Sequence, residues 1–278
     1  MKRAITILLL AVLFSTNLYS QQIQEVNRSY YDWDWTRDGI WTGLGIAGSA
    51  VGLMLIQNKE GLTEAELAMV VAKQDDINFI DKWAVGNNSD SANNFSDIPF
   101  AFSFATPLLL LFDDEVNEQT ATVLGLYLES LATTGAMYTL TAGLVSRSRP
   151  YVYSDEESLE RRTSGNGQRS FYSGHVAAAA TATFFTAKVY TDLNPDLKGK
   201  FFVWTGAALV PATIAYFRLE AGQHFLTDMM LGYALGAATG YLVPELHRTK
   251  VEGVSIRPAA GITRLGDEYK GLSLNYTF

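Results

Sequence analysis

Ser173-Gly174-His175 stands at the head of the apolar run 176–187, where a polar loop ends and a helix is predicted to begin. The first turn of a helix offers unpaired backbone N–H groups and a partial positive charge, and both favour phosphate. Gly174 lets a ligand approach the backbone closely, and His175 adds a titratable imidazole at the same place. The tripeptide is short enough to occur by chance, so its meaning depends on the other histidines.

His224 and His247 are the other two of the three histidines in the chain. His224 lies in the pattern Arg218-x5-His224-x3-Asp228, and two helical residues four apart share a face. If this segment is helical, the Asp228 carboxylate holds one imidazole nitrogen of His224 as a donor. The other nitrogen is then free to act as a nucleophile or a base.

Two arginines lie upstream in the segment Ser146-Arg147-Ser148-Arg149-Pro150, and a guanidinium group can grip phosphate through two parallel hydrogen bonds. Arg-Pro, then Ser-Gly-His, then Arg-x5-His-x3-Asp, in this order, resembles the type 2 phosphatidic acid phosphatase superfamily. That superfamily includes lipid phosphatases, bacterial non-specific acid phosphatases and vanadium haloperoxidases. The resemblance covers roughly residues 95–246, and the combined motif is specific although each part alone is not.

The chain departs from the superfamily signature, which is Lys-x6-Arg-Pro, Pro-Ser-Gly-His and Ser-Arg-x5-His-x3-Asp. Ala142 stands in place of the lysine, Tyr172 in place of the proline, and Phe217 in place of the serine before Arg218. The last two positions carry no chemistry, whereas Ala142 removes one cation from the expected phosphate site. Arg147 is five residues further on and would point elsewhere on a helix, so it is an uncertain substitute.

The resemblance implies a phosphatase that forms a phosphohistidine and needs neither a cofactor nor a metal ion. His224, oriented by Asp228, would be the nucleophile, and His175 would protonate the leaving oxygen and then activate water. Four residues would bind the phosphate oxygens: Arg149, Arg218, Ser173 and Gly174.

Four classes of function stay open on these residues. The first is a phosphatase for a lipid phosphate or diphosphate, and the second is a soluble, broad-specificity acid phosphatase with the same site. A vanadate-dependent haloperoxidase is the third, and the missing lysine weakens it. The fourth is a non-catalytic envelope protein, against which the intact His–Asp pair speaks. Two imidazoles and a carboxylate are also a common metal ligand set, but the neighbouring arginines prepare this site for an anion.

The composition of the 278-residue chain limits its partners. The chain has no Cys, which excludes disulfides and thiolate chemistry, and its formal net charge of −8 argues against binding nucleic acid. The resemblance implies a phosphorylated lipid or small phosphoester as the substrate, and a membrane surface as a partner. The mean hydropathy of +0.06 is low for a chain largely embedded in lipid, although the apolar residues are strongly clustered.

Four parts are predicted along the chain. Residues 1–20 are typical of a signal peptide, with Lys2 and Arg3 before an apolar stretch. Residues 21–37 are an aromatic segment, which suits either a membrane–water boundary or packing on the domain. Residues 38–249 are predicted to form the helical phosphatase domain, and residues 250–278 a β-hairpin tail that packs on the domain.

The predicted fold is all-α, a bundle of six helices followed by the hairpin. Six apolar segments are too long for strands: 39–57, 98–112, 118–145, 176–190, 200–217 and 227–243. A short helix is expected over 63–74 and an Asn/Ser-rich loop over 86–96. The charged loop 151–172 suits a lid or a solvated connector. Glu129 receives no role, and His247, among charged residues, is expected to be exposed.

The predicted location is the exported, periplasmic side of the cell envelope, with the helical domain at or anchored to a membrane. The alternative is an inner-membrane protein with six spans whose N-terminal segment is not cleaved. A cleaved signal followed by six spans would instead leave Arg149 and His175 in the cytoplasm. The low mean hydropathy and the terminal hairpin favour the first placement.

Overall fold

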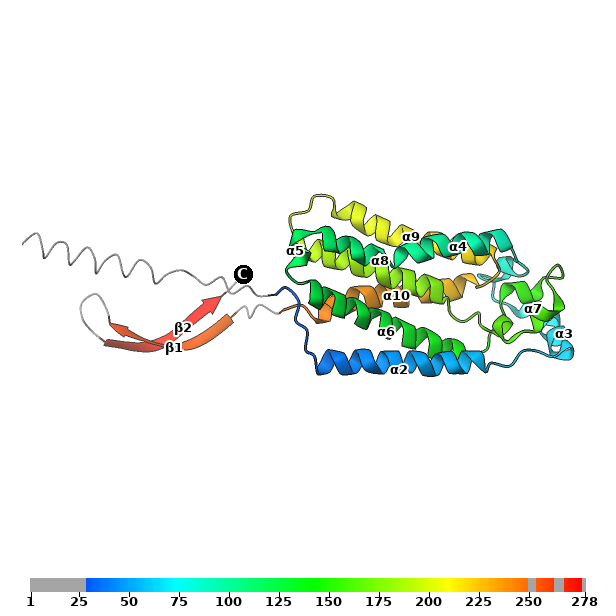
Figure 1. The fold of residues 1–278 in the computed structure, drawn as a ribbon, viewed down its shortest axis with the longest axis horizontal. Coiled ribbons are helices and arrows are strands. Elements are labelled where there is room, and N and C mark those ends of the chain that lie inside the picture. Colours follow the sequence, from blue (N-terminus) through cyan, green and yellow to red (C-terminus); the bar gives the residue numbers. More distant parts are fainter. Residues whose placement is uncertain (1–28, 250–253, 263–267, 277–278) are drawn as a thin grey trace, which may run out of the picture.

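The structure is a computed structural model that describes residues 29–249, 254–262 and 268–276. The signal peptide expected over 1–20 lies outside the described residues. Long helices run side by side as a bundle, and the short helices α3 and α7 lie at one end of it (Figure 1). The long helices are α2 (Arg37–Gln57), α4 (Asp90–Ser103), α6 (Thr120–Leu144), α8 (Gly174–Leu193), α9 (Lys200–Glu220) and α10 (Leu226–Leu246). The predicted all-α class of the domain is confirmed.

The number of helices differs from the prediction, because the described part of the chain contains nine α-helices rather than six. One of the other three, α3 (Glu64–Ala72), is the short helix expected over 63–74, whereas α5 (Asp114–Asn117) and α7 (Leu159–Thr163) were not predicted. At the start of each one, the side chain of the preceding residue accepts a backbone N–H of the first turn. These residues are Thr63, Asp113 and Ser158. Local caps of this kind do not depend on an apolar run, so the count of apolar segments underestimates the helices.

The second apolar segment is divided between two elements. Helix α4 begins at Asp90, inside the stretch expected to be a loop, because the Ser89 hydroxyl accepts the N–H of Ala92 at 3.2 Å. It ends at Ser103, and a 3₁₀ turn, η4 (Thr106–Phe112), follows with Pro107 in its first turn. The Asn/Ser-rich segment is thus the start of a helix, and it places Asn93, Ser96 and Asp97 beside the site described below.

Helix α8 lies at the centre of the bundle and packs against α6, α9 and α10. Its inward residues are small, mostly alanine and threonine, so that the neighbouring helices approach closely. At Gly240 of α10, an added Cβ would lie 2.4 Å from the carbonyl oxygen of Thr181 in α8. The close contact of α8 and α10 holds the start of α8 against the start of α10, where the motif residues lie.

Three segments are long and apolar enough to cross a membrane: Arg37–Gln57, Asp90–Phe112 and Lys200–Glu220. Their outward faces carry large apolar side chains that the protein leaves exposed, among them Trp41, Phe102 and Phe202. Exposed apolar surface on this scale is typical of a membrane-facing protein. The finding supports membrane association of the helical domain.

The connection between α6 and α8 is folded against the bundle. It contains the 3₁₀ turns η5 (Pro150–Tyr153) and η6 (Gly165–Gln168) on either side of α7. Tyr151 and Val152 are buried and pack with Leu67 of α3. This packing gives the motif arginine next to η5 a fixed position.

The segments before and after the helical domain differ in how they lie relative to it. The described part of the aromatic segment, residues 29–37, packs on the domain, since Tyr31 is buried and its hydroxyl donates to Asp192 at 2.9 Å. Strands β1 (Val254–Ile262) and β2 (Glu268–Tyr276) pair antiparallel. They lie beyond one end of the bundle in Figure 1, whereas the sequence led us to expect them against the helices. They take no part in the site.

Candidate active site

The motif residues come from two connections, α6 to α8 and α9 to α10, and from the helix ends beside them, which meet at the end of the bundle where α3 and α7 lie. Arg147 and Arg149 follow α6, Ser173 and His175 stand at the start of α8, and Arg218 lies in the last turn of α9. His224 precedes α10, and Asp228 lies in its first turn. The backbone N–H of Ser173 donates to the carbonyl of Asp228 at 3.2 Å, which joins the second and third motifs directly.

His224 is held by the main chain. Its Nδ1 lies 2.6 Å from the carbonyl oxygen of Ser170, so Nδ1 carries the proton and donates it there. The Nε2 atom of the neutral ring then bears a lone pair. Burial, together with the charge of Arg149, lowers the pKa of His224 well below its ordinary value. The imidazole is therefore kept neutral, in the tautomer that a nucleophile requires.

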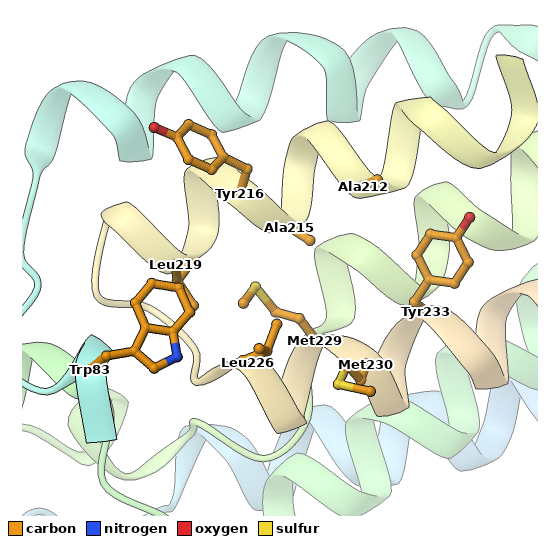
Figure 2. Close-up of a pocket in the computed structure, with 9 residues that line it drawn as sticks. All are labelled: Trp83, Ala212, Ala215, Tyr216, Leu219, Leu226, Met229, Met230 and Tyr233. Atoms are coloured by element: carbon orange, nitrogen blue, oxygen red, sulfur yellow. The ribbon is translucent and has the colours of Figure 1, made fainter. Parts of the chain in front are cut away.

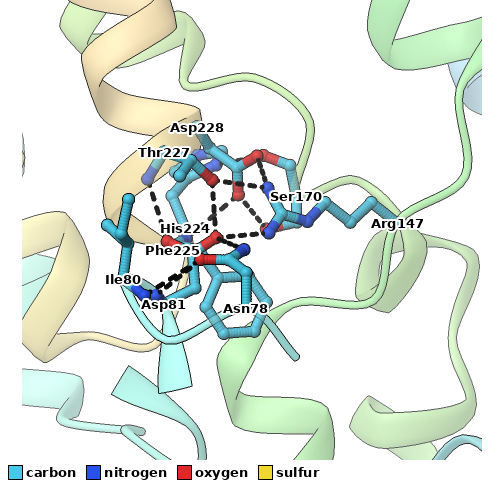
Figure 3. Close-up of polar contacts among 9 residues, drawn as sticks. All are labelled: Asn78, Ile80, Asp81, Arg147, Ser170, His224, Phe225, Thr227 and Asp228. Carbon is cyan, nitrogen blue, oxygen red and sulfur yellow. Dashed lines mark hydrogen bonds and ion pairs between the residues drawn. The ribbon is translucent and has the colours of Figure 1, made fainter. Parts of the chain in front are cut away.

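Asp228 does not contact His224 directly. The predicted hydrogen bond between the two side chains is wrong, because none is present among the residues that the structure describes. The Asp228 carboxylate accepts hydrogen bonds from the Ser170 hydroxyl at 2.6 Å and from the Phe225 N–H at 3.0 Å, and it pairs with Arg147 (Figure 3). Helix α10 begins only at Leu226, so His224 lies before it and the four-residue helical spacing does not apply. Ser170 links the two, because its hydroxyl contacts Asp228 and its carbonyl contacts His224.

Arg147 belongs to this network and not to the phosphate site. Its guanidinium pairs with Asp228 and lies 2.7 Å from an oxygen of Asp81, so that it bridges two buried carboxylates (Figure 3). Asp81 also accepts the hydroxyl of Thr227 at 2.6 Å. Asp81 lies far from the motifs in the sequence, in a segment without an apolar pattern, and sequence analysis missed it. The network fixes the start of α10.

Arg149 and Arg218 have no carboxylate within 4 Å among the residues that the structure describes. Their exposed fractions are 4% and 6%, and the Nε of each has no hydrogen-bond partner. Their partners are neutral: Arg149 donates to Gln223, and Arg218 donates to Asn93 at 2.8 Å. Burial lowers the pKa of Arg149, because a buried positive charge without a counter-ion is unfavourable. The two guanidinium groups form a site for an anion.

Ser173 and Gly174 lie at the edge of this anion site. The Ser173 hydroxyl oxygen is buried and has no hydrogen-bond partner, although the residue precedes the first turn of α8. At Gly174, an added Cβ would lie 2.6 Å from the ring of Tyr138 in α6. The glycine is therefore required by the packing of Tyr138 as well as by the access of a ligand.

His175 stands at the opening of the site. Its side chain is partly exposed, its ring stacks on Phe100 at a centroid distance of 4.1 Å, and its Nε2 lies 3.3 Å from a carboxylate oxygen of Asp97. Burial and the charge of Arg218 lower the pKa of His175 to about 4. The ring is thus neutral in the ligand-free protein, and an anion bound at the arginines would raise its pKa.

The position of the missing lysine is filled by packing. Ala142 is fully buried, and its carbonyl accepts a hydrogen bond from the Nζ of Lys59 at 2.9 Å. One turn earlier, Tyr138 faces the site, and its hydroxyl lies 3.5 Å from a guanidinium nitrogen of Arg169. The Nε of Arg169 has no hydrogen-bond partner. Arg169 therefore adds a third guanidinium to this end, which the sequence indicated only as a charge in a loop.

An apolar groove lies between α9 and α10 (Figure 2). Its volume is about 490 Å³, and it is lined by Trp83, Ala212, Ala215, Tyr216, Leu219, Leu226, Met229, Met230 and Tyr233. Leu219 and Leu226 bracket the segment that carries His224, so the groove reaches the end of the bundle that carries the arginines.

The comparisons with known proteins agree with this geometry. Residues 123–252 match the family model of the PAP2 superfamily, a span that contains every motif residue from Ala142 to Asp228. The lipid A 4'-phosphatase of Porphyromonas gingivalis is 31% identical over 81 residues, which are 29% of this chain and 31% of that protein. This chain thus matches about a third of the length of that curated relative. No solved structure matches the chain.

Proposed function

We propose that this chain, whose residues 123–252 belong to the PAP2 superfamily, is a phosphatase that removes phosphate from a lipid. One observation carries the proposal: two buried arginines without a carboxylate lie beside a neutral histidine whose Nδ1 proton is fixed by the main chain. A phosphoryl group needs cations for its oxygens and an in-line nucleophile, and this end of the bundle offers both.

The proposed reaction has two steps. The Nε2 lone pair of His224 attacks phosphorus, the bond to the leaving oxygen breaks, and His175 gives its proton to that oxygen. Water, deprotonated by His175, then attacks the phosphohistidine and releases inorganic phosphate from His224. His175 is neutral when the site is free, so the phosphate itself supplies the negative charge that favours its protonated form.

Arg149, Arg218, Ser173 and Gly174 are the proposed phosphate ligands. Each of the first three has a buried polar atom without a hydrogen-bond partner, which phosphate oxygens would satisfy. Asp228 is a positioning residue in this scheme, because it acts on His224 through Ser170. The scheme uses no metal ion, and we expect turnover to continue in the presence of excess chelator.

A lipid is favoured over a soluble phosphoester by the apolar surface. The groove between α9 and α10 suits an acyl or isoprenyl chain whose head group lies at the arginines (Figure 2). Three helices are long and apolar enough to cross a membrane, and the relative from P. gingivalis is named for a lipid phosphate. A soluble, broad-specificity acid phosphatase is the second candidate, since the anion site alone would serve it.

A turnover panel separates these candidates. The full-length chain in detergent is assayed with para-nitrophenyl phosphate, phosphatidate, an isoprenyl diphosphate and lipid A, each with and without chelator. We expect kcat/KM for one lipid to exceed that for para-nitrophenyl phosphate by ~10-fold or more, because the apolar chain adds binding energy. Equal values would favour the broad-specificity phosphatase. Hydrolysis of none of them would contradict the proposal, and halide oxidation with vanadate would indicate a haloperoxidase.

The proposed location is the periplasmic side of the envelope, with residues 1–20 as the signal peptide, 21–37 as the aromatic segment, 38–249 as the phosphatase domain and 250–278 as the tail. A cysteine can be placed at exposed Glu156, at the end of the bundle that carries the arginines, and at exposed Asp196, at the opposite end. The chain has no native Cys, so labelling is specific. If the domain is periplasmic, a reagent that does not cross the inner membrane labels both cysteines. Labelling of one only, together with resistance to carbonate extraction, would support the six-span alternative.

A further inference from the structure

A second cluster of titratable side chains lies at the other end of the bundle. Asp38 is in the first turn of α2, Glu129 is in α6, and His247 directly follows α10. Asp38 is separated by the length of α2, about 28 Å for 19 residues, from the end of the bundle that carries the arginines. His247 is buried, which corrects the expectation that it is exposed.

The three side chains point at one another. The Nε2 of His247 lies 3.2 Å from Oδ1 of Asp38 and 3.5 Å from Oε2 of Glu129. The three ligand atoms all lie within 4.8 Å of one another. In a tetrahedral site with bonds of about 2.0–2.1 Å, two ligand atoms lie about 3.3 Å apart, so the observed spacing fits an ion between them.

The hydrogen bond of the other ring nitrogen orients His247 toward the two carboxylates. Its Nδ1 lies 2.7 Å from the carbonyl oxygen of Val243 and donates a proton there. This contact leaves Nε2 directed at the two carboxylate oxygens, so a cation placed between the three atoms would be in reach of all of them. Metal-binding histidines commonly donate the other ring N–H to a backbone carbonyl in this way.

Two atoms of the cluster are buried without a hydrogen-bond partner: Oε2 of Glu129 and Nε2 of His247. Both side chains are only 7% exposed. Unpartnered polar atoms at this burial are rare, and here both point to the same place. They are the independent sign that a ligand belongs to this carboxylate cluster.

The surroundings complete the site. The second oxygen of Asp38 accepts the N–H of Asp34 at 2.8 Å, and this bond orients the carboxylate. The guanidinium of Arg37 also pairs with both oxygens of Asp38, and its side chain is 60% exposed. The cluster opens to a cavity of about 610 Å³, which provides an entry path and room for a water molecule as a fourth ligand.

We propose that Asp38, Glu129 and His247 bind one divalent transition-metal ion of the zinc class. Two carboxylates and one imidazole are ligands that zinc accepts, and three protein ligands with one water complete a tetrahedron. The ion ties α2, α6 and the end of α10 together, so it stabilises the fold and takes no part in phosphate hydrolysis.

Metal binding to the full-length protein in detergent tests the proposal. The protein is stripped with chelator, and Zn²⁺ binding is measured by calorimetry and by the shift in melting temperature. Co²⁺ serves as a spectroscopic probe, because its visible bands report a four- or five-coordinate site with nitrogen and oxygen ligands. We expect one ion per chain and a higher melting temperature with zinc.

Variants assign the ligands. Glu129→Gln and His247→Gln should each weaken zinc binding by on the order of 100-fold or more, since each removes a direct ligand. His224→Ala, the matched change at the other buried histidine, should leave zinc binding unchanged. Arg37→Ala should bind zinc more tightly, because it removes a positive charge beside the site, and its exposure makes it safe for folding.

The proposal is overturned if no zinc binds at ~1 mM, which is the weak limit of a specific site. Binding that His247→Gln leaves unchanged would also overturn it, as would Arg37→Ala weakening the affinity. The cluster would then be an imidazolium between two carboxylates. None of these outcomes depends on the phosphatase activity, because every readout is binding or stability.

Discussion

The two buried histidines at opposite ends of the bundle share one arrangement and differ in their surroundings. His224 donates its Nδ1 proton to the carbonyl of Ser170 at 2.6 Å, and His247 donates its own to the carbonyl of Val243 at 2.7 Å. In each ring the Nε2 atom is the one that points away from the main chain. Arginines without carboxylate partners surround the first, whereas two carboxylates face the second. The neighbouring charges, and not the imidazole, decide whether such a site suits an anion or a cation.

The largest effect is expected from His224→Ala. Loss of the nucleophile should lower turnover by several orders of magnitude, because the covalent step is removed. His247→Ala is the matched change, and in assays well below its melting temperature it should keep most of the turnover. If His224→Ala retains more than about a tenth of the wild-type rate, a difference of only ~1.4 kcal/mol, His224 is not the nucleophile.

Arg149→Ala should have the next largest effect. It removes a buried cation from the proposed phosphate site, and losses of about 10²–10³ in kcat are typical for one donor to a developing oxyanion. Arg149→Lys should recover part of the activity, because it keeps the charge but not the two parallel hydrogen bonds. Vanadate inhibition constants measured on both variants should follow the same order. Unchanged inhibition in Arg149→Ala would remove this residue from the anion site.

Asp228→Asn tests the indirect link between the carboxylate and the nucleophile. The Ser170 carbonyl still accepts from His224 in this variant, so we expect an activity loss of about 10-fold to 10²-fold, much smaller than that of His224→Ala. The Asn should also lower the melting temperature, since Arg147 then loses one of its two carboxylates. A loss as large as that of His224→Ala would mean that Asp228 contacts the imidazole during the reaction.

Part of the fold and of the candidate site could be predicted from the sequence. The long apolar segments predicted the all-α domain, and the motifs predicted the residues that meet at one end of the bundle. The partners of those residues were not predicted. Asp81 and Ser170 lie in connections without periodic patterns, and Asp97 lies in the part of α4 near the segment expected to be a loop. The Asp228–His224 contact was wrongly predicted because the start of α10, at Leu226, depends on the local fold.

The burial of His247 was not predicted either, because it depends on contacts between distant parts of the chain. A histidine among charged residues at the end of a helix is typical of solvent exposure, yet here the aromatic segment covers it. The Trp33 ring stacks on His247 at a centroid distance of 6.4 Å, and the Asp32 N–H donates to the His247 carbonyl. Burial by a segment more than 200 residues away in the chain is not visible in a local pattern.

The pKa of His175 tests whether an anion binds beside the arginines, and His247 at the other end of the bundle serves as the control. The His175 pKa of about 4 in the free protein should rise when vanadate binds, because an anion then offsets the arginines. NMR titration is feasible, since the chain has three histidines. The signal of His247 should not move with vanadate. An unchanged His175 titration would mean that the anion binds elsewhere.

The smallest effect is expected from Arg169→Gln. Arg169 lies beside Tyr138, one turn before Ala142, where the superfamily signature has a lysine. Its loss should weaken vanadate binding by about 3-fold to 10-fold. Ala142→Lys in the Arg169→Gln background should restore part of that affinity, although the buried site must rearrange to admit the longer side chain. Wild-type affinity in Arg169→Gln would place this guanidinium outside the anion site.

Ser170 presents its carbonyl, and not its side chain, to His224. A main-chain oxygen is the same in all twenty amino acids, so the orientation of the imidazole is a property of the path of the chain. Alanine scanning of this position would report only the lost hydroxyl and would underestimate what the residue does. Relatives with a different amino acid here can keep the same ring orientation. A search for functional positions by side-chain identity alone would therefore pass over the contact that holds the nucleophile.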